Sequence, residues 1–313
     1  VKESKKKAKH HITIEDIPYT SIEFAKNNPV SLESGTSHKM QLVTGPANAT
    51  DHRIKWTSSN KTAATVDENG TVTALRPIET VTITAVYKTN PALTCSWNLK
   101  ITRTKGYITK QMLDNLDLTA IKKVMITAHP DDETLWGGGH LIEGEYLVVC
   151  MTHGWNPKRR TAFEQTMRTT NDKYLILDYP DVRKTFSNGK YETDMLSTCK
   201  NAMQEDINLI LSYKKWDLIA THNPFGEYGK FLHKTISQMV TQCYNKMTNK
   251  SATLYYFGRY YNSSNKIPGE QIAPELLAIK NSMVDRYYPT AKGAIVAFGH
   301  MIPYENWLLP SEW

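Results

Sequence analysis

The chain has 313 residues, an ordinary globular composition and a formal net charge of +7. This length is comfortable for two domains, each with its own core. No apolar run is long enough to cross a bilayer, and the four cysteines are too few and too far apart for a disulfide framework or a cysteine-ligated zinc site. The positive charge is dispersed and no nucleic-acid motif accompanies it, so we expect no nucleic-acid partner.

Residues 1–18 are basic, with three consecutive lysines at 5–7 and no periodicity, which predicts a flexible tether. Because the numbering starts at Val1 rather than at a methionine, we expect a leader or anchor to have been removed before it. Dispersed positive charge is typical of a solvated surface, and it also favours attachment to anionic polymers such as cell-wall or sulfated glycans.

Residues 19–103 alternate apolar with polar side chains and show no helical periodicity, which predicts β-strands. Turn signals at Gly45-Pro46, 58–60 and Asn69-Gly70 separate the runs. The clearest runs occupy residues 21–24, 40–43, 54–57 and 81–86. This pattern predicts an immunoglobulin-like sandwich of about seven strands.

Within this segment, Trp56–Asn60, Ala64–Asp67 and Asn69–Val72 resemble the group 2 bacterial immunoglobulin-like domain. The resemblance implies a secreted or cell-surface bacterial protein, in which such a domain has a spacing or adhesive role and no chemistry of its own. We therefore expect this domain, with the basic N-terminus, to attach the protein to a cell envelope or a host glycan. The alternation of Trp56 with Ile54 predicts a core tryptophan, and a sugar-stacking platform is the alternative.

Residues 104–313 change to an alternation of strands and helices, which is typical of a parallel sheet. We predict an α/β domain with a Rossmann-like, mostly parallel sheet flanked by helices. Strands are expected at 124–128, 146–151, 174–177 and 216–221, and helices at 159–170 and 196–213. In such sheets ligands bind at the carboxyl ends of the strands.

The first of these strands ends in the string Ala128-His129-Pro130-Asp131-Asp132-Glu133. Pro130 cannot continue a strand, and the acidic residues after it suit the first turn of a helix. His129 and Asp132 can occupy two corners of a zinc ion, with a third ligand from elsewhere and one position left for water. Asp131 is then free for acid–base chemistry. In the alternative interpretation, the two aspartates cap the helix and His129 is a turn residue.

The fourth predicted strand leads into a second loop, which runs from Thr221 to His233 and contains the sequence Gly226-Glu227-Tyr228-Gly229. His233 begins a helix-like run and is the predicted third ligand. Two imidazoles and one carboxylate leave an open coordination position, which is the mark of a catalytic rather than a structural zinc site.

The string from Ala128 to Glu133 resembles the motif of the PIG-L/LmbE-like de-N-acetylases, the family of N-acetylglucosaminyl de-N-acetylases. These zinc hydrolases remove acetyl groups from N-acetylhexosamine sugars. The resemblance extends over roughly residues 120–313. It implies that His129, Asp132 and His233 hold Zn²⁺ or another divalent transition metal, and that Asp131 is the general base.

The second loop departs from this family, in which it usually ends Gly-His-Pro-Asp-His. Here Lys230 replaces the first histidine, which stabilises an oxyanion or protonates the leaving amine, and Leu232 replaces the aspartate that orients that histidine. Lys230 offers three donors and a positive charge for the same work, or it points into solvent. Tyr228 matches a family tyrosine that reaches the reacting carbonyl, and it is the other predicted catalytic donor.

Arg160 and Asp181 match family sugar contacts less specifically, and we predict that they bind substrate hydroxyls; a surface ion pair and a turn cap are the alternatives. The sequence thus predicts a metal-dependent hydrolase of linear amides, a carbohydrate de-N-acetylase. The competing hypothesis is a glycan-binding surface protein with weak or no catalysis, which the loss of the histidine–aspartate pair favours.

Overall fold

A computed structural model of the chain describes residues 15–181, 193–248 and 250–313. Residues 1–14, which hold most of the predicted tether, lie outside the described residues. The chain divides into two compact units, Val1–Leu75 with Thr80–Lys100 and Arg76–Glu79 with Ile101–Trp313. We describe each unit by itself, as the N-terminal and the C-terminal unit.

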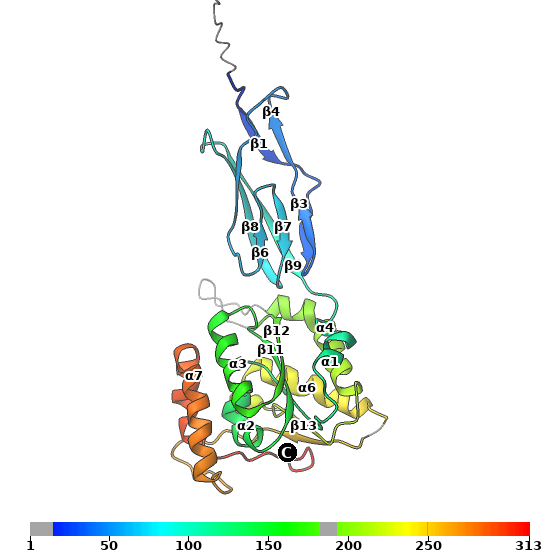
Figure 1. The fold of residues 1–313 in the computed structure, drawn as a ribbon, viewed down its shortest axis with the longest axis vertical. Coiled ribbons are helices and arrows are strands. Elements are labelled where there is room, and N and C mark those ends of the chain that lie inside the picture. Colours follow the sequence, from blue (N-terminus) through cyan, green and yellow to red (C-terminus); the bar gives the residue numbers. More distant parts are fainter. Residues whose placement is uncertain (1–14, 182–192, 249) are drawn as a thin grey trace, which may run out of the picture. The chain divides into compact units, whose positions relative to one another are not determined.

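The N-terminal unit is built of strands, as predicted (Figure 1). Between residues 15 and 102 the structure describes nine strands. They are β1 (Ser21–Phe24), β2 (Ser31–Glu33), β3 (Ser37–Lys39), β4 (Leu42–Gly45), β5 (Ile54–Ser58), β6 (Ala64–Val66), β7 (Thr71–Ala74), β8 (Ile78–Tyr87) and β9 (Thr94–Thr102). They form sheets of order β1-β4, β2-β9-β8-β5 and β3-β7-β6. The predicted number of about seven was wrong, because three-residue strands such as β2 and β3 are too short to show an alternation.

Trp56 belongs to the packed interior of this unit. Its ring is half-buried and meets the ring of Phe24 edge-on, with 5.9 Å between the centroids. Gly70 lies directly beneath it at φ +80°, where a Cβ atom would come 2.6 Å from the indole. A side chain enclosed in this way is a core residue rather than an exposed platform, which supports the core interpretation.

The C-terminal unit is an α/β domain, as predicted, with one parallel sheet of five strands and helices around it. Its strands are β10 (Lys123–Thr127), β11 (Tyr146–Thr152), β12 (Lys173–Tyr179), β13 (Leu218–Thr221) and β14 (Thr253–Tyr256). Its helices are α1 (Lys110–Asn115), α2 (Asp132–Glu143), α3 (Pro157–Thr170), α4 (Thr193–Ser212), α5 (Gly226–Gly229), α6 (Phe231–Lys246) and α7 (Pro274–Phe298), followed by the short 3₁₀ helix η1 (Gly299–Met301).

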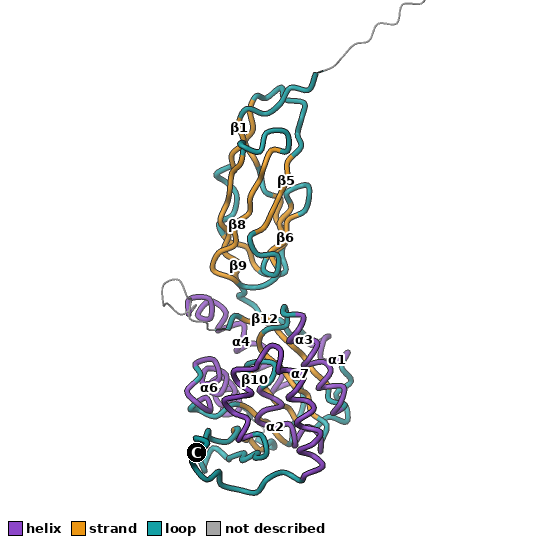
Figure 2. Tube along the Cα trace, turned by 90° about the vertical axis from the view of Figure 1, so that its left-hand side faces the viewer, coloured by secondary structure: helices purple, strands orange, loops and turns teal. Residues whose placement is uncertain are grey.

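Helices cover both faces of the sheet, so the central strands are apolar at almost every position. Val124 and Ile126 of β10 join a core with α1, α4 and α6. Met125, between them, points to the opposite face and joins a second core with α2, α3 and α7. Figures 1 and 2 show these two layers of helices on either side of the strands.

Helix α2 is seated by its three consecutive glycines, residues 137–139. A Cβ atom on Gly138 would lie 2.9 Å from the side chain of Lys280 on α7, so the helices approach closely only because none is present. The fully buried Lys280 ammonium bonds Glu305 at 2.6 Å, and this carboxylate also accepts from the backbone N–H of Gly139 at 2.6 Å. Glu305 further pairs with the His140 ring at 2.5 Å. This Lys280–Glu305 pair fixes α2, whose first turn carries the predicted metal motif.

The order of the sheet, β12-β11-β10-β13-β14, runs outward from β10 in both directions. Ile126 pairs with Thr221, so β10 and β13 end side by side and their following loops leave in different directions. Ligands bind at such a switch point in open α/β sheets. Across the described residues, no helix combines the length and the apolarity that a bilayer crossing requires.

Candidate metal centre

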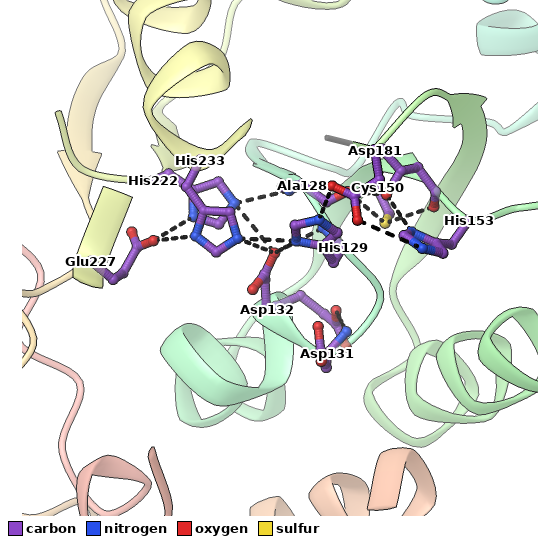
Figure 3. Close-up of polar contacts among 12 residues, drawn as sticks. Ala128, His129, Asp131, Asp132, Cys150, His153, Asp181, His222, Glu227 and His233 are labelled. Atoms are coloured by element: carbon purple, nitrogen blue, oxygen red, sulfur yellow. Dashed lines mark hydrogen bonds and ion pairs between the residues drawn. The ribbon is translucent and has the colours of Figure 1, made fainter. Parts of the chain in front are cut away.

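Three side chains from the two predicted motifs converge over the carboxyl ends of β10 and β13 (Figure 3). His129 Nδ1 lies 3.0 Å from His233 Nε2 and 3.2 Å from Asp132 Oδ2, and His233 Nε2 lies 3.4 Å from the same oxygen. All three residues are buried. His129 follows β10 closely, Asp132 begins α2, and His233 stands in the first turn of α6. The structure therefore brings together the three predicted ligands, although 104 positions separate the two histidines.

Glu227 fixes the orientation of His233. Its Oε2 accepts a hydrogen bond from His233 Nδ1 at 2.5 Å and lies 3.1 Å from His222 Nδ1. Since Nδ1 of His233 carries the proton, Nε2 presents a lone pair to His129 and Asp132. Burial raises the pKa of Glu227, but His222 and His233 outweigh burial and hold it below its ordinary value. Glu227 thus remains a carboxylate in the interior.

Asp181 holds the other histidine in the same way. Its Oδ1 lies 3.0 Å from His129 Nε2, so Nε2 donates to the carboxylate and Nδ1 faces the cluster. Burial lowers the pKa of His129, but Asp181 and Asp132 outweigh it and raise the pKa to about 9. Burial likewise disfavours the charged form of Asp132, yet His233 and His222 lower its pKa. The carboxylates therefore favour positive charge at the centre of the cluster.

His222 packs against His233 and against the end of β10. Its ring stacks on His233 with 3.9 Å between centroids, and its Nε2 accepts the backbone N–H of Ala128 at 2.9 Å. Because Nε2 is an acceptor, Nδ1 carries the proton and donates to Glu227. His222 therefore connects the start of the loop after β10, at Ala128, with the loop after β13, at Glu227.

Asp131 is buried beside the ligands and has a strained backbone, with φ +139°. Its N–H donates to Glu133 Oε2 at 3.0 Å, and Glu133 is held in turn by the Tyr287 hydroxyl at 2.6 Å. Burial, and then the charge of Asp132, raise the pKa of Asp131 to about 8. A carboxyl group with a raised pKa next to a cation-binding cluster is suited to accept and return a proton.

The three converging atoms fit a tetrahedral metal ion. Ligand atoms about 2.05 Å from such an ion lie about 3.3 Å from one another. The observed separations of 3.0, 3.2 and 3.4 Å match this value. Once Glu227 and Asp181 hold the outer ring nitrogens, the three inner atoms favour a positive charge between them, which either a proton on His129 or a divalent cation supplies. His222, Glu227 and His233 also lie within ligand distance of one another, but their facing atoms are already joined by hydrogen bonds.

Of the two predicted catalytic donors, Tyr228 contacts a residue of the cluster. The ring of Tyr228 meets that of His233 edge-on at 5.7 Å, and burial followed by the charges of Asp132 and Asp131 raises its pKa, so its hydroxyl stays protonated. Lys230 is half-buried. Its positive charge lowers the pKa of Asp181, after the larger effects of burial and His129.

Leu232, where the resemblance to the de-N-acetylases leads one to expect an aspartate, is fully buried in the core around α6. A carboxylate that orients an imidazole would have no ring to orient here, because residue 230 is a lysine.

Arg160 lies on α3, where its Nε donates to the Gly154 carbonyl at 2.6 Å and its Nη1 pairs with Glu164 at 3.5 Å. The adjacent Arg159 is the arginine whose charge acts on Asp131. Sugar binding by Arg160 and Asp181 stays a prediction, and the structure adds for Asp181 the contact with His129 described above.

Sequence reasoning gave no role to Glu227 or Glu133. The available signal for Glu227 was its place between two glycines in a loop that ends in a predicted ligand. Its φ of +53°, unusual for a residue with a side chain, shows that the turn places the carboxylate inward at a cost in strain.

Comparisons with known proteins give a family match for the N-terminal unit and relatives for a larger part of the chain. The model of the bacterial Ig-like domain (group 2) matches residues 18–96, so the N-terminal unit is a domain of that group. An uncharacterized protein of Acanthamoeba polyphaga mimivirus, L374, is 31% identical over 175 residues, which cover 50% of this chain and 67% of the relative. The chain belongs to the family of that viral protein.

Other matches are narrower. The uncharacterized protein CA_P0160 of Clostridium acetobutylicum is 32% identical over 117 residues, which cover 37% of this chain and 12% of that protein. Among solved structures, the conserved protein TT1542 of Thermus thermophilus is 13% identical with a TM-score of 0.43, over 62% of this chain and 96% of that one.

Proposed function

We propose that the C-terminal unit is a metal-dependent de-N-acetylase that hydrolyses the acetamide of an N-acetylhexosamine glycan. The observation that carries this proposal is the set of three ligand-atom separations among His129, Asp132 and His233, which fit a tetrahedral ion with one open position. Asp131 beside this set is the second requirement for hydrolysis, because sugar binding alone needs no base next to a metal.

Each residue then has a defined task. His129 through Nδ1, His233 through Nε2 and Asp132 through Oδ2 hold the ion, while Asp181 and Glu227 keep both rings in the right tautomer. A bound divalent ion supplies a Lewis acid that acidifies water and polarises the acetyl carbonyl.

Asp131 takes the proton of the attacking water at its carboxylate and later returns it to the nitrogen of the leaving amine. Tyr228, whose ring contacts His233, and Lys230, whose charge acts on Asp181, are the proposed donors to the carbonyl oxygen as it gains negative charge. Water and the acetamide are consumed, and acetate and the free amino sugar are released.

The N-terminal unit supports a location outside the cell. Group 2 bacterial Ig-like domains occur in surface or extracellular bacterial proteins. We propose that this unit holds the protein at a cell envelope or at a host glycan, and that the C-terminal unit, with its Rossmann-like sheet, carries out the catalysis.

Acetate release from a panel of N-acetylhexosamine oligosaccharides, with zinc added, tests the proposal. We expect release by the wild type and its loss, by at least about 10³-fold, in Asp131→Asn, which keeps the size of the side chain but removes the base. Metal content measured after dialysis is the second readout. Absence of both acetate and bound metal across the panel would refute the proposal.

A glycan-binding protein without catalysis is the second candidate, and the buried Leu232 in place of an acid favours it. Asp131→Asn separates the two candidates. A catalyst loses turnover and keeps its affinity for the glycan, whereas a binding protein shows neither turnover in the wild type nor any change in affinity.

A further inference from the structure

A pocket of about 600 Å³ opens beside the metal centre. Its lining residues are Phe225, Glu227, Tyr228, Arg259, Tyr260 and Trp313. Glu227 and Tyr228 line this pocket and also contact His233, so the pocket is adjacent to the centre. The volume lies within the range of small-molecule sites, about 300–1,000 Å³, and leaves room for more than an acetamide. We call it the aromatic pocket.

Two aromatic side chains of this pocket are exposed to solvent. Phe225 is 60% exposed and Tyr228 is 41% exposed. Both stand on the loop that carries His233, only three positions apart. Single exposed apolar residues are ordinary, but several aromatic rings gathered at the mouth of a site mark a binding surface.

The pocket also offers polar groups in a fixed position. The Arg259 guanidinium stacks on Trp313 at 4.5 Å from the ring centroid, and its Nη2 donates to the Trp313 carbonyl at 2.8 Å. A guanidinium has five N–H donors in one plane, and this arrangement holds that plane against the ring. On the other side, the Lys234 ammonium lies 5.1 Å from the centroid of the Phe225 ring.

Aromatic faces combined with planar donors are complementary to a pyranose ring, which has apolar C–H faces and hydroxyl groups around its edge. A lipid or an apolar peptide in the pocket would desolvate the charge of Arg259 without giving it a polar partner, which costs free energy. Tyr228 faces His233 on one side and lines the pocket on the other, so a ring in the pocket is a neighbour of whatever group reacts at the centre.

We propose that the aromatic pocket is a subsite for the sugar ring next to the one that is deacetylated. The substrate is then an oligosaccharide or polysaccharide rather than a free monosaccharide. This inference rests on the proposed function for the placement of the reacting sugar, but it assigns new residues, Phe225 and Arg259, and a substrate class to the pocket.

Calorimetric titration with N-acetylglucosamine and with its β-1,4-linked tetramer tests the subsite. The zinc-loaded Asp131→Asn variant is used as the background, so that hydrolysis does not change the probe. We expect the tetramer to bind at least tenfold more tightly than the monosaccharide. Phe225→Ala in the same background weakens tetramer binding about tenfold and brings the two affinities together. Tyr288→Ala, an aromatic residue of α7 that is 42% exposed and does not line the pocket, is the matched control and leaves tetramer affinity unchanged.

Equal affinities for the two probes, a tetramer that does not bind, or an equal loss for Tyr288→Ala and Phe225→Ala would each overturn the subsite. Acetate release by the wild type from the tetramer is measured separately. If tetramer binding depends on Phe225 but no acetate is released across the oligosaccharide panel and no metal is bound, the deacetylase proposal fails and the aromatic pocket stands only as a glycan-binding site. If acetate appears and the two probes bind equally, the subsite fails while the deacetylase stands.

Discussion

Replacement of Glu227 by glutamine tests how His233 is held. One carboxylate oxygen serves both imidazole N–H groups, at 2.5 and 3.1 Å, and the other accepts the backbone N–H of Asn223 at 3.1 Å. Glutamine has a single accepting oxygen, so whichever way its amide is turned, the NH₂ group faces a donor. One such mismatch in the interior costs about 1–3 kcal/mol. Loss of an orienting partner of a metal-bound histidine costs about 10–100-fold in metal affinity, about 1.4–2.8 kcal/mol, which is the same range.

Competition between the protein and a fluorescent zinc chelator at neutral pH measures this affinity. Glu270→Gln, at an exposed position, is the matched control and should leave affinity unchanged. Glu227→Gly is a companion variant, because glycine accepts the φ of +53° without strain and removes the carboxylate alone. If both Glu227 variants bind zinc within about twofold of the wild type, His233 does not depend on Glu227 and the reasoning is wrong.

Three further outcomes are expected. Glu305→Gln leaves the buried Lys280 without its counter-charge and lowers the free energy of unfolding by about 3–5 kcal/mol in urea titrations at pH 7. Burial raises the pKa of Glu305, but Lys280 outweighs burial and lowers the pKa to about 2. The stabilisation is therefore present above pH 4.5 and is lost as the pH falls toward 2. The difference in free energy of unfolding between Glu305→Gln and the wild type should narrow at pH 3. Gly70→Ala places a Cβ atom 2.6 Å from the Trp56 ring at φ +80° and should destabilise the N-terminal unit by about 1–3 kcal/mol, measured by thermal unfolding. Lys230→Met should lower kcat for acetate release by about two to three orders of magnitude with little change in KM, and an unchanged kcat would show that its ammonium serves only solvation.

The convergence of His129, Asp132 and His233 was predictable because each motif follows a strand of one parallel sheet. A histidine and two aspartates after β10, and a histidine in the loop after β13, reach the same edge wherever those strands are neighbours. The contact of Asp181 with His129 was not predictable, since no pattern of residue types shows where a side chain two positions beyond the end of β12 points. The role of Glu227 depends on a backbone angle that no pattern of residue types encodes.

The α/β alternation and the β-rich N-terminal segment were also readable from periodicity. Strand β14 and helix α7 were not predicted. β14 has only four residues, and α7 contains Pro289, Gly293 and a non-helical Ala291, which weaken the helical signal although the helix runs for 25 residues. Both elements are formed by tertiary packing, which a local reading of the sequence does not include.

The glycine-rich middle of α2 has a consequence for biosynthesis. Three successive glycines disfavour a helix by about 1 kcal/mol each, so this segment gains little from forming alone. What compensates is contact with residue 280 and with the carboxylate at 305, both synthesised well over a hundred residues later. The first turn of α2 supplies Asp132, so a nascent chain that stops before residue 305 lacks the means to assemble the centre. A ribosome-bound or truncated protein should therefore take up no zinc until its last segment has emerged.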